Sequence, residues 1–265
     1  MRRILFILLL FASCEGNTNS VTNTAISYQA QVEKLQPDSL LSGIQDKIYN
    51  AFVQSLMTKE DTKLLELSNR LKELNETEQQ QKIILYWRSY LQFYCSIYYL
   101  QNEDKKKAEK VIDQGIEWLD KMKNKNSEDY ALLAMLQSFG IQFKGMRAMF
   151  ISDEIKKNAK LAIANDSTNL RAYYVYGSND FYTPVKYGGG KEVEECLLKA
   201  ISLPTQKVKN EFLPSWGKEE SYELLIRYYI ENEKWDLAKR YFQEAIKEYP
   251  ESYTVNQLAA KLLEK

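Results

Sequence analysis

The chain has 265 residues, with 36 basic and 36 acidic side chains and no histidine. Because this balanced charge provides no long-range attraction for nucleic acids, nucleic-acid binding is not expected. The absence of histidine excludes Ser-His-Asp, Cys-His and histidine-zinc mechanisms, since histidine is the usual base near neutral pH and the commonest metal ligand. We therefore expect a protein that is not an enzyme and that uses neither a cofactor nor a metal.

The first fourteen residues predict export from the cytoplasm. Two arginines precede the apolar residues 4–12, a run too short to cross a hydrocarbon core of ~30 Å. Residues 11–14, Phe-Ala-Ser-Cys, resemble the lipobox of bacterial lipoproteins, although phenylalanine replaces the usual leucine. The resemblance implies a signal peptide over 1–13, a lipid on Cys14 and a place in the cell envelope, at the outer membrane rather than the inner. The alternative is an ordinary secretory signal in which Cys14 is coincidental.

The rest of the chain divides into a tether and one helical domain. Residues 14–27 are rich in Asn, Thr and Ser, which predicts a flexible tether, and the domain is expected over 28–265. Apolar residues recur at three- and four-residue steps without strand-like alternation, so the domain should be almost entirely helical. Breaks between helices are predicted at residues 58–61, 75–77, 101–104, 123–127, 165–169, 183–190, 204–217, 231–234 and 250–252.

These helices carry a recurring motif. Its clearest copy is Tyr222-x2-Leu225-Ile226-x2-Tyr229 followed by Ala238-x3-Phe242-x2-Ala245 and Pro250. A second copy runs from Gln92 to Gly115, and a third from Tyr173 to Ala200 contains four extra residues. The motif resembles the tetratricopeptide repeat (TPR), which implies an all-α, TPR-like helical-repeat solenoid of about five antiparallel helix pairs with an extended concave face.

The extra length lies in the loop 183–190, which contains three successive glycines. Gly188-Gly189-Gly190-Lys191 admits a phosphate-loop interpretation, but no strand precedes it and Glu192 stands where Ser or Thr is required. We favour the interpretation that the glycines let an enlarged turn bend back. This loop is similar to an insertion found in repeat lipoproteins related to the T component of TRAP transporters.

Other chemical candidates have simple structural interpretations. Glu192 and Glu195 are expected on a solvated first turn, where acidic groups favour the helix dipole, and the lysines at 105–107 and 156–157 on exposed faces. Cys95 and Cys196 fall inside predicted helices, so we expect buried free thiols rather than a disulfide.

The TPR resemblance also implies a binding surface, because in that family the first helix of each pair lines the concave face. Carried over to this sequence, it gives partner-binding positions at Tyr90, Phe93, Ile97, Arg171, Tyr174, Ser178, Glu223 and Arg227. Tyrosine and arginine are common at binding hot spots.

Two functions follow from these expectations. The first is a lipid-anchored envelope scaffold that binds a protein or peptide partner on its concave face. The alternative is an accessory lipoprotein of a transport system that binds a small molecule or a solute-binding protein. An enzyme would need a base other than histidine and a cleft that no motif indicates.

Overall fold

A computed structural model describes residues 39–74, 81–205 and 210–263. Every regular element in these ranges is helical, which confirms the predicted all-α class. The predicted signal peptide, the tether and Cys14 lie outside the described residues, as does the expected start of the domain.

The helices follow the sequence pattern closely. They are α2 (Ile44–Thr58), α3 (Thr62–Lys72), α4 (Gln81–Gln101), α5 (Lys105–Lys121), α6 (Ser127–Gly140), α7 (Ala148–Asn165), α8 (Leu170–Tyr182), α9 (Val193–Ser202), α10 (Lys218–Glu231), α11 (Trp235–Glu248), α12 (Tyr253–Asn256) and α13 (Ala259–Leu263). Short 3₁₀ turns η1 (Ile141–Phe143), η2 (Gly145–Arg147) and η3 (Val185–Tyr187) lie in two of the connections. The break between α6 and α7 was not predicted, because apolar residues continue through it.

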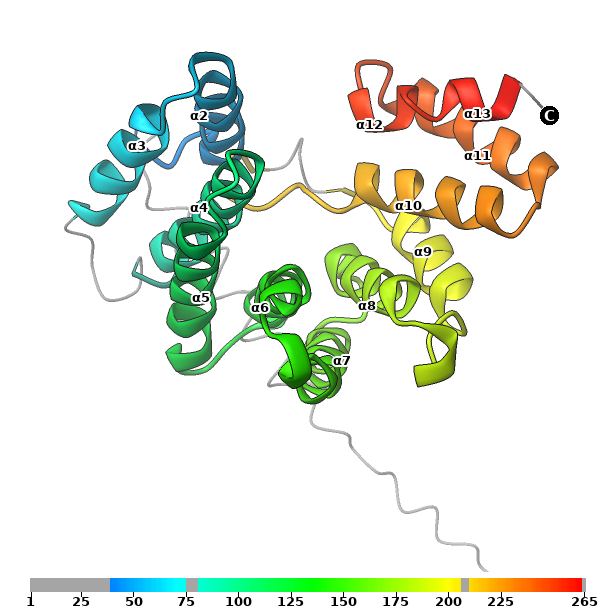
Figure 1. Cartoon of the computed structure of the whole chain (residues 1–265), viewed down its shortest axis with the longest axis horizontal. Helices are drawn as coiled ribbons and strands as arrows, with labels where there is room; N and C mark the ends of the chain where they lie inside the picture. The colour runs from blue at the N-terminus through cyan, green and yellow to red at the C-terminus, as the bar shows by residue number, and fades with distance from the viewer. Residues whose placement is uncertain (1–38, 75–80, 206–209, 264–265) are drawn as a thin grey trace, which may run out of the picture.

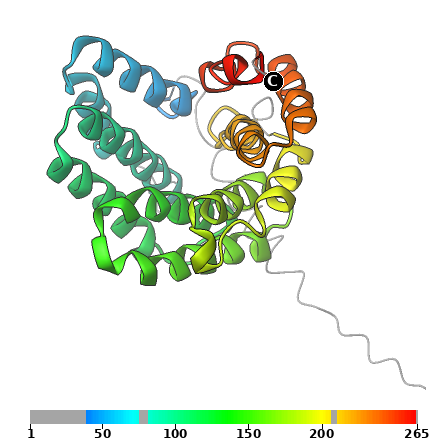
Figure 2. The ribbon, with the colours of Figure 1, turned by 45° about the vertical axis from the view of Figure 1, so that its right-hand side comes forward.

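Consecutive helices pack in five pairs, α2 with α3, α4 with α5, α6 with α7, α8 with α9 and α10 with α11. The first helix of each pair also contacts the first helix of the next, so α2, α4, α6, α8 and α10 form the inner layer of an arc (Figures 1 and 2). The predicted helical-repeat fold of about five pairs is therefore confirmed.

The repeat extends to individual contacts between pairs. Tyr99 donates to Asp61 Oδ2 at 2.8 Å, and Lys107 donates to the same oxygen at 2.9 Å. Far along the chain, Tyr229 and Lys234 donate to the two carboxylate oxygens of Glu194 at 3.0 and 2.7 Å. In both places a tyrosine at the end of an inner helix and a nearby lysine hold an acid of the preceding pair.

Glycines permit close approach both within and between the pairs. A Cβ on Gly115 of α5 would lie 2.9 Å from Leu136 Cδ2 of the next pair, and one on Gly177 of α8 would lie 3.0 Å from Cys196 Cβ of α9. Both distances are shorter than carbon contacts in a packed interior allow. Cys95 and Cys196 are buried free thiols, as expected.

Candidate binding site on the concave face

The inner side of the arc holds a segment of the chain itself. Residues 210–217, which we call the inner strap, precede α10 and cross to the far end of the arc (Figure 1). There, the backbone N–H of Gly43 donates to Glu211 O at 3.2 Å, and Gln45 Oε1 accepts from the N–H groups of Ser215 and Trp216 at 2.8 and 3.2 Å. The strap therefore joins the first helix pair to the last.

Aromatic side chains of α4 and α8 hold the strap. Trp87 Nε1 donates to Phe212 O at 2.9 Å, and Trp216 Nε1 donates to the hydroxyl of Tyr86 at 2.9 Å. The Trp216 ring stacks on Tyr90 and meets the edge of Tyr174, each with a centroid separation of 6.2 Å. Trp216 is only 4% exposed, so it belongs to the core.

Arg171 fixes the C-terminal end of the strap. Its guanidinium forms a two-point ion pair with Glu128 of α6 and donates from Nη1 to Trp216 O at 3.3 Å. Burial by itself lowers the pKa of Arg171, but the Glu128 carboxylate outweighs that effect and the pKa lies above its ordinary value. Gly217 follows with φ 107°, and a Cβ there would lie 2.9 Å from Arg171 Cγ. Only glycine fits this position without strain.

The structure thus corrects two predicted partner-binding positions. Tyr90 and Arg171 are on inner helices, as expected, but they are 3% and 5% exposed because the strap covers them. Ile97 is partly buried against the core. Glu223 and Arg227 pair at 3.5 Å, and Arg227 also donates to the Tyr182 hydroxyl at 3.1 Å, so they link α10 to α8.

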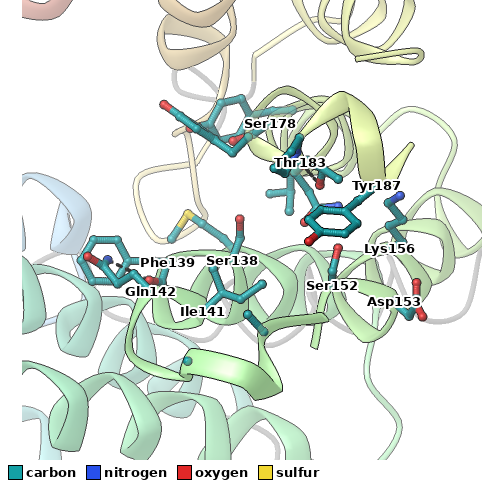
Figure 3. A pocket seen from close by; sticks show the side chains of 18 of the residues that line it. Ser138, Phe139, Ile141, Gln142, Ser152, Asp153, Lys156, Ser178, Thr183 and Tyr187 are labelled. Carbon is teal, nitrogen blue, oxygen red and sulfur yellow. Dashed lines mark hydrogen bonds between the residues drawn. The ribbon is translucent and has the colours of Figure 1, made fainter. Parts of the chain in front are cut away.

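The remaining three positions, Phe93, Tyr174 and Ser178, line a pocket of about 1100 Å³ beside the strap. Its other lining residues come from α6, η1, η2, α7, α8 and the loop after α8: Met135, Ser138, Phe139, Ile141, Gln142, Gly145, Met146, Ala148, Ser152, Asp153, Lys156, Val175, Asn179, Tyr182, Thr183, Pro184 and Tyr187. Figure 3 shows Ser178 and Thr183 across from Phe139 and Ile141. The lining is mostly apolar, with hydroxyl and amide groups between the aromatic rings.

The glycine loop forms one wall of this pocket. A Cβ on Gly189 would lie 1.9 Å from Thr183 O, and Gly190 donates its N–H to Asp180 O at 3.1 Å. Gly188 and Gly190 both have positive φ, near 87° and 86°. These features confirm that the glycines let the turn bend back onto α8, which places Thr183 and the following residues at the pocket.

The phosphate-loop interpretation fails on the same contacts. The N–H groups of Gly188, Gly189 and Gly190 donate to carbonyl oxygens of Val185, Pro184 and Asp180. Asp180 Oδ2 accepts from Glu192 N at 2.7 Å, so this backbone amide at the start of α9 is also occupied. None of these four donors points toward a ligand.

The acidic and basic candidates behave largely as expected. Glu192 and Glu195 are exposed at the start of α9, and the lysines at 105–107 are exposed on α5. Lys157 is exposed, but Lys156 is half-buried and lines the pocket. Within the described ranges, no group of three or more Cys, Asp or Glu side chains is arranged to hold a metal ion.

Sequence reasoning missed the strap and the α6–α7 side of the pocket. The strap lies in a predicted break, but that break contains Phe212, Leu213 and Trp216. Large apolar residues in a connection are the signal that it is buried. The α6–α7 connection carried a weaker signal in Gly145, whose φ is 50°.

Comparison with known proteins adds no family assignment. No protein-family model matches the chain, and no curated protein matches its sequence. Among the described helices, none combines the length and apolar character needed to cross a bilayer.

Proposed function

We propose that this protein binds an apolar or amphipathic organic molecule in the pocket between α6 and α8. The observation that supports the proposal most directly is the pocket itself, with its volume of about 1100 Å³ and its mostly apolar lining. Ligand pockets typically enclose about 300–1000 Å³ and combine apolar walls with a few polar groups. This pocket lies just above that range.

The inner strap argues against an extended peptide as the main ligand. A peptide lying along α2, α4 and α8 would have to displace Trp216 from Tyr90 and Tyr174 and break the bonds of Trp87 and Gln45 to the strap. Removing a buried tryptophan from its contacts costs about 3–5 kcal/mol, a large share of a domain's stability. The pocket requires no such displacement.

The pocket lining indicates the chemistry of the ligand. The rings of Phe93 and Phe139 pack edge to face at 5.1 Å and provide an apolar wall at one end. At the other end, Lys156, Asp153 and Thr183 supply polar groups. A molecule with an apolar body and a polar head matches this arrangement.

With the expected lipid on Cys14, the protein would act in the cell envelope as an accessory of a transport system. This part of the proposal rests on the resemblance of residues 11–14 to a lipobox and on the loop insertion.

The binding proposal is tested with N-phenyl-1-naphthylamine, an uncharged apolar dye that fluoresces when buried. Wild-type protein is expected to bind it, and Ser178→Trp, which places an indole in the pocket, is expected to reduce the affinity at least about tenfold, or ~1.4 kcal/mol. Ser202→Trp places the same ring at an exposed position on α9 and serves as the control. Equal binding by wild type and Ser178→Trp would contradict the proposal.

A second candidate is a protein partner that inserts one apolar side chain into the pocket. It is favoured by the partial exposure of Phe93, Tyr174 and Ser178, which the TPR resemblance places on the partner-binding face. A photoreactive benzoylphenylalanine in place of Tyr187 at the pocket would then crosslink a polypeptide in native membranes. The same residue in place of exposed Tyr253 is the control, and no polypeptide specific to position 187 would contradict this candidate.

A further inference from the structure

Large apolar side chains are exposed around the mouth of the pocket. Met146 is 96% exposed, Phe150 74%, Val185 82% and Tyr187 62%. Single exposed apolar residues need no explanation, but a group on neighbouring turns marks a surface that is covered in function. We call these four residues the apolar rim.

Two of the four rim residues line the pocket, and the other two lie next to pocket-lining segments in the sequence. Met146 on η2 and Tyr187 on η3 both line the pocket. Phe150 lies in the first turn of α7, directly after η2, and Val185 begins η3 beside the pocket residue Pro184. The rim therefore projects from η2 together with the first turn of α7, and from η3, rather than from one flat helix face.

Two basic side chains adjoin the rim residues in the sequence. Arg147 follows Met146, Lys186 lies between Val185 and Tyr187, and both are exposed. Lys186 lies over the Tyr187 ring at 4.9 Å, whereas Lys144 is already paired with Glu109 and Asp113.

No acidic residue lies within two positions of any rim residue in the sequence. The nearest exposed acid is Asp153, three positions after Phe150. The turns that carry the rim therefore have a local positive charge.

We infer that the apolar rim docks on the surface of an anionic lipid bilayer, with the mouth of the pocket facing the lipid. Apolar side chains enter the boundary between headgroups and acyl chains, and neighbouring Lys and Arg are attracted to anionic headgroups within about one Debye length. This inference rests on exposure and charge alone, so it does not depend on what the pocket binds.

The shape of the rim favours a lipid surface over a protein. A stable protein interface buries about 800 Å² on each side with well-matched surfaces. The rim instead presents separate protruding side chains on two turns, with basic groups between them. A fluid bilayer accommodates such tips without shape complementarity.

The test is flotation of the chain carrying Cys14→Ser, so that no lipid anchor contributes, with phosphatidylcholine vesicles that contain or lack phosphatidylglycerol. We expect flotation only with the anionic vesicles. Phe150→Ser with Val185→Ser, or Arg147→Gln with Lys186→Gln, should each weaken binding at least about tenfold. All four side chains are exposed, so folding should not change, and circular dichroism checks this.

Met57→Ser with Tyr253→Ser removes two exposed apolar residues from other helices and serves as the matched control. Its binding should equal that of the parent chain. The inference is overturned if the parent chain fails to float with anionic vesicles, or if the control loses as much binding as the rim variants. Equal flotation with both vesicle types would overturn the role of the basic residues. If benzoylphenylalanine in place of Phe150 crosslinks a protein while the parent chain binds no vesicles, the rim belongs to a protein interface instead.

Discussion

The indole of Trp216 stacks on the ring of Tyr90 with an angle of 21° between the two planes, although the residues are 126 positions apart in the sequence. This contact places the inner strap on α4 and accounts for the burial of a residue that the TPR resemblance would expose. The concave face of the first four helix pairs is thus partly filled by the chain itself. The pocket beside Tyr174 is left as the open site.

Replacing Trp216 with alanine should therefore destabilise the whole fold. The change removes a buried ring, its contacts with Tyr90 and Tyr174 and a hydrogen bond to Tyr86, which together predict a loss of about 3–5 kcal/mol. Urea denaturation followed by circular dichroism measures the loss. Tyr253→Ala, at an exposed position, is the control, and a loss below about 1 kcal/mol at Trp216 would show that the strap is not part of the core.

Two neighbouring glycines in the loop 183–190 allow the cost of backbone strain to be measured separately from the cost of a steric clash. Gly188→Ala places a side chain at φ 87° with no atom within 4 Å, so a cost of about 1–2 kcal/mol is expected. Gly189→Ala places a Cβ 1.9 Å from Thr183 O, and the loop must move to relieve the collision. Thermal denaturation and dye binding should both show a larger effect at 189, and an equal or larger effect at 188 would refute this account of the loop.

The fold was more predictable from the sequence than the site was. Helix boundaries such as Gln101, Asn165 and Glu231 coincide with predicted breaks because local turn chemistry and apolar periodicity determine them. The packing of Trp216 against Tyr90 and Tyr174 is instead a contact between segments far apart in the sequence, which periodicity does not encode. Phe93, Tyr174 and Ser178 were correctly placed on the inner layer, whereas the pocket walls from η1 and η2 required the structure.

The carboxyl group of Asp129 predicts a pH dependence of stability. It is buried in the capping box of α6, where its Oδ2 accepts from Asn126 N at 2.9 Å, and burial raises its pKa to about 7. The folded state therefore binds the proton more tightly than the unfolded state, whose Asp pKa is about 3.9. Because of this group, stability should fall as the pH rises from about 4 to 7.

Asp129→Asn removes that titration and retains an oxygen that can accept from Asn126. The variant should be more stable than wild type at about pH 8, and the difference should shrink toward about pH 4. Denaturation curves across this range provide the measurement. A difference that stays constant with pH, or grows on acidification, would show that Asp129 does not titrate as described.

The expected lipid on Cys14 makes a separate prediction. Intact mass should show acyl chains on the wild-type protein, which should sediment with membranes, because stable anchoring takes more than one chain. Cys14→Ser should lack the added mass, and a high-salt wash should release it from the membranes, whereas the lipidated wild-type protein should stay bound. If the wild-type protein carries no acyl mass after cleavage, the signal is an ordinary secretory one.

The most direct test of the pocket as the binding site is dye binding with the strap locked in place. In a chain whose native cysteines are replaced, Gln45→Cys and Ser215→Cys joined by a short bismaleimide would fix the strap to α2. These residues are already in contact, since the N–H of Ser215 donates to Gln45 Oε1 at 2.8 Å. If the strap is a permanent part of the core, locking it should leave the affinity for N-phenyl-1-naphthylamine unchanged. Loss of binding on locking would mean that the strap must leave, and that the groove beneath it is the binding site.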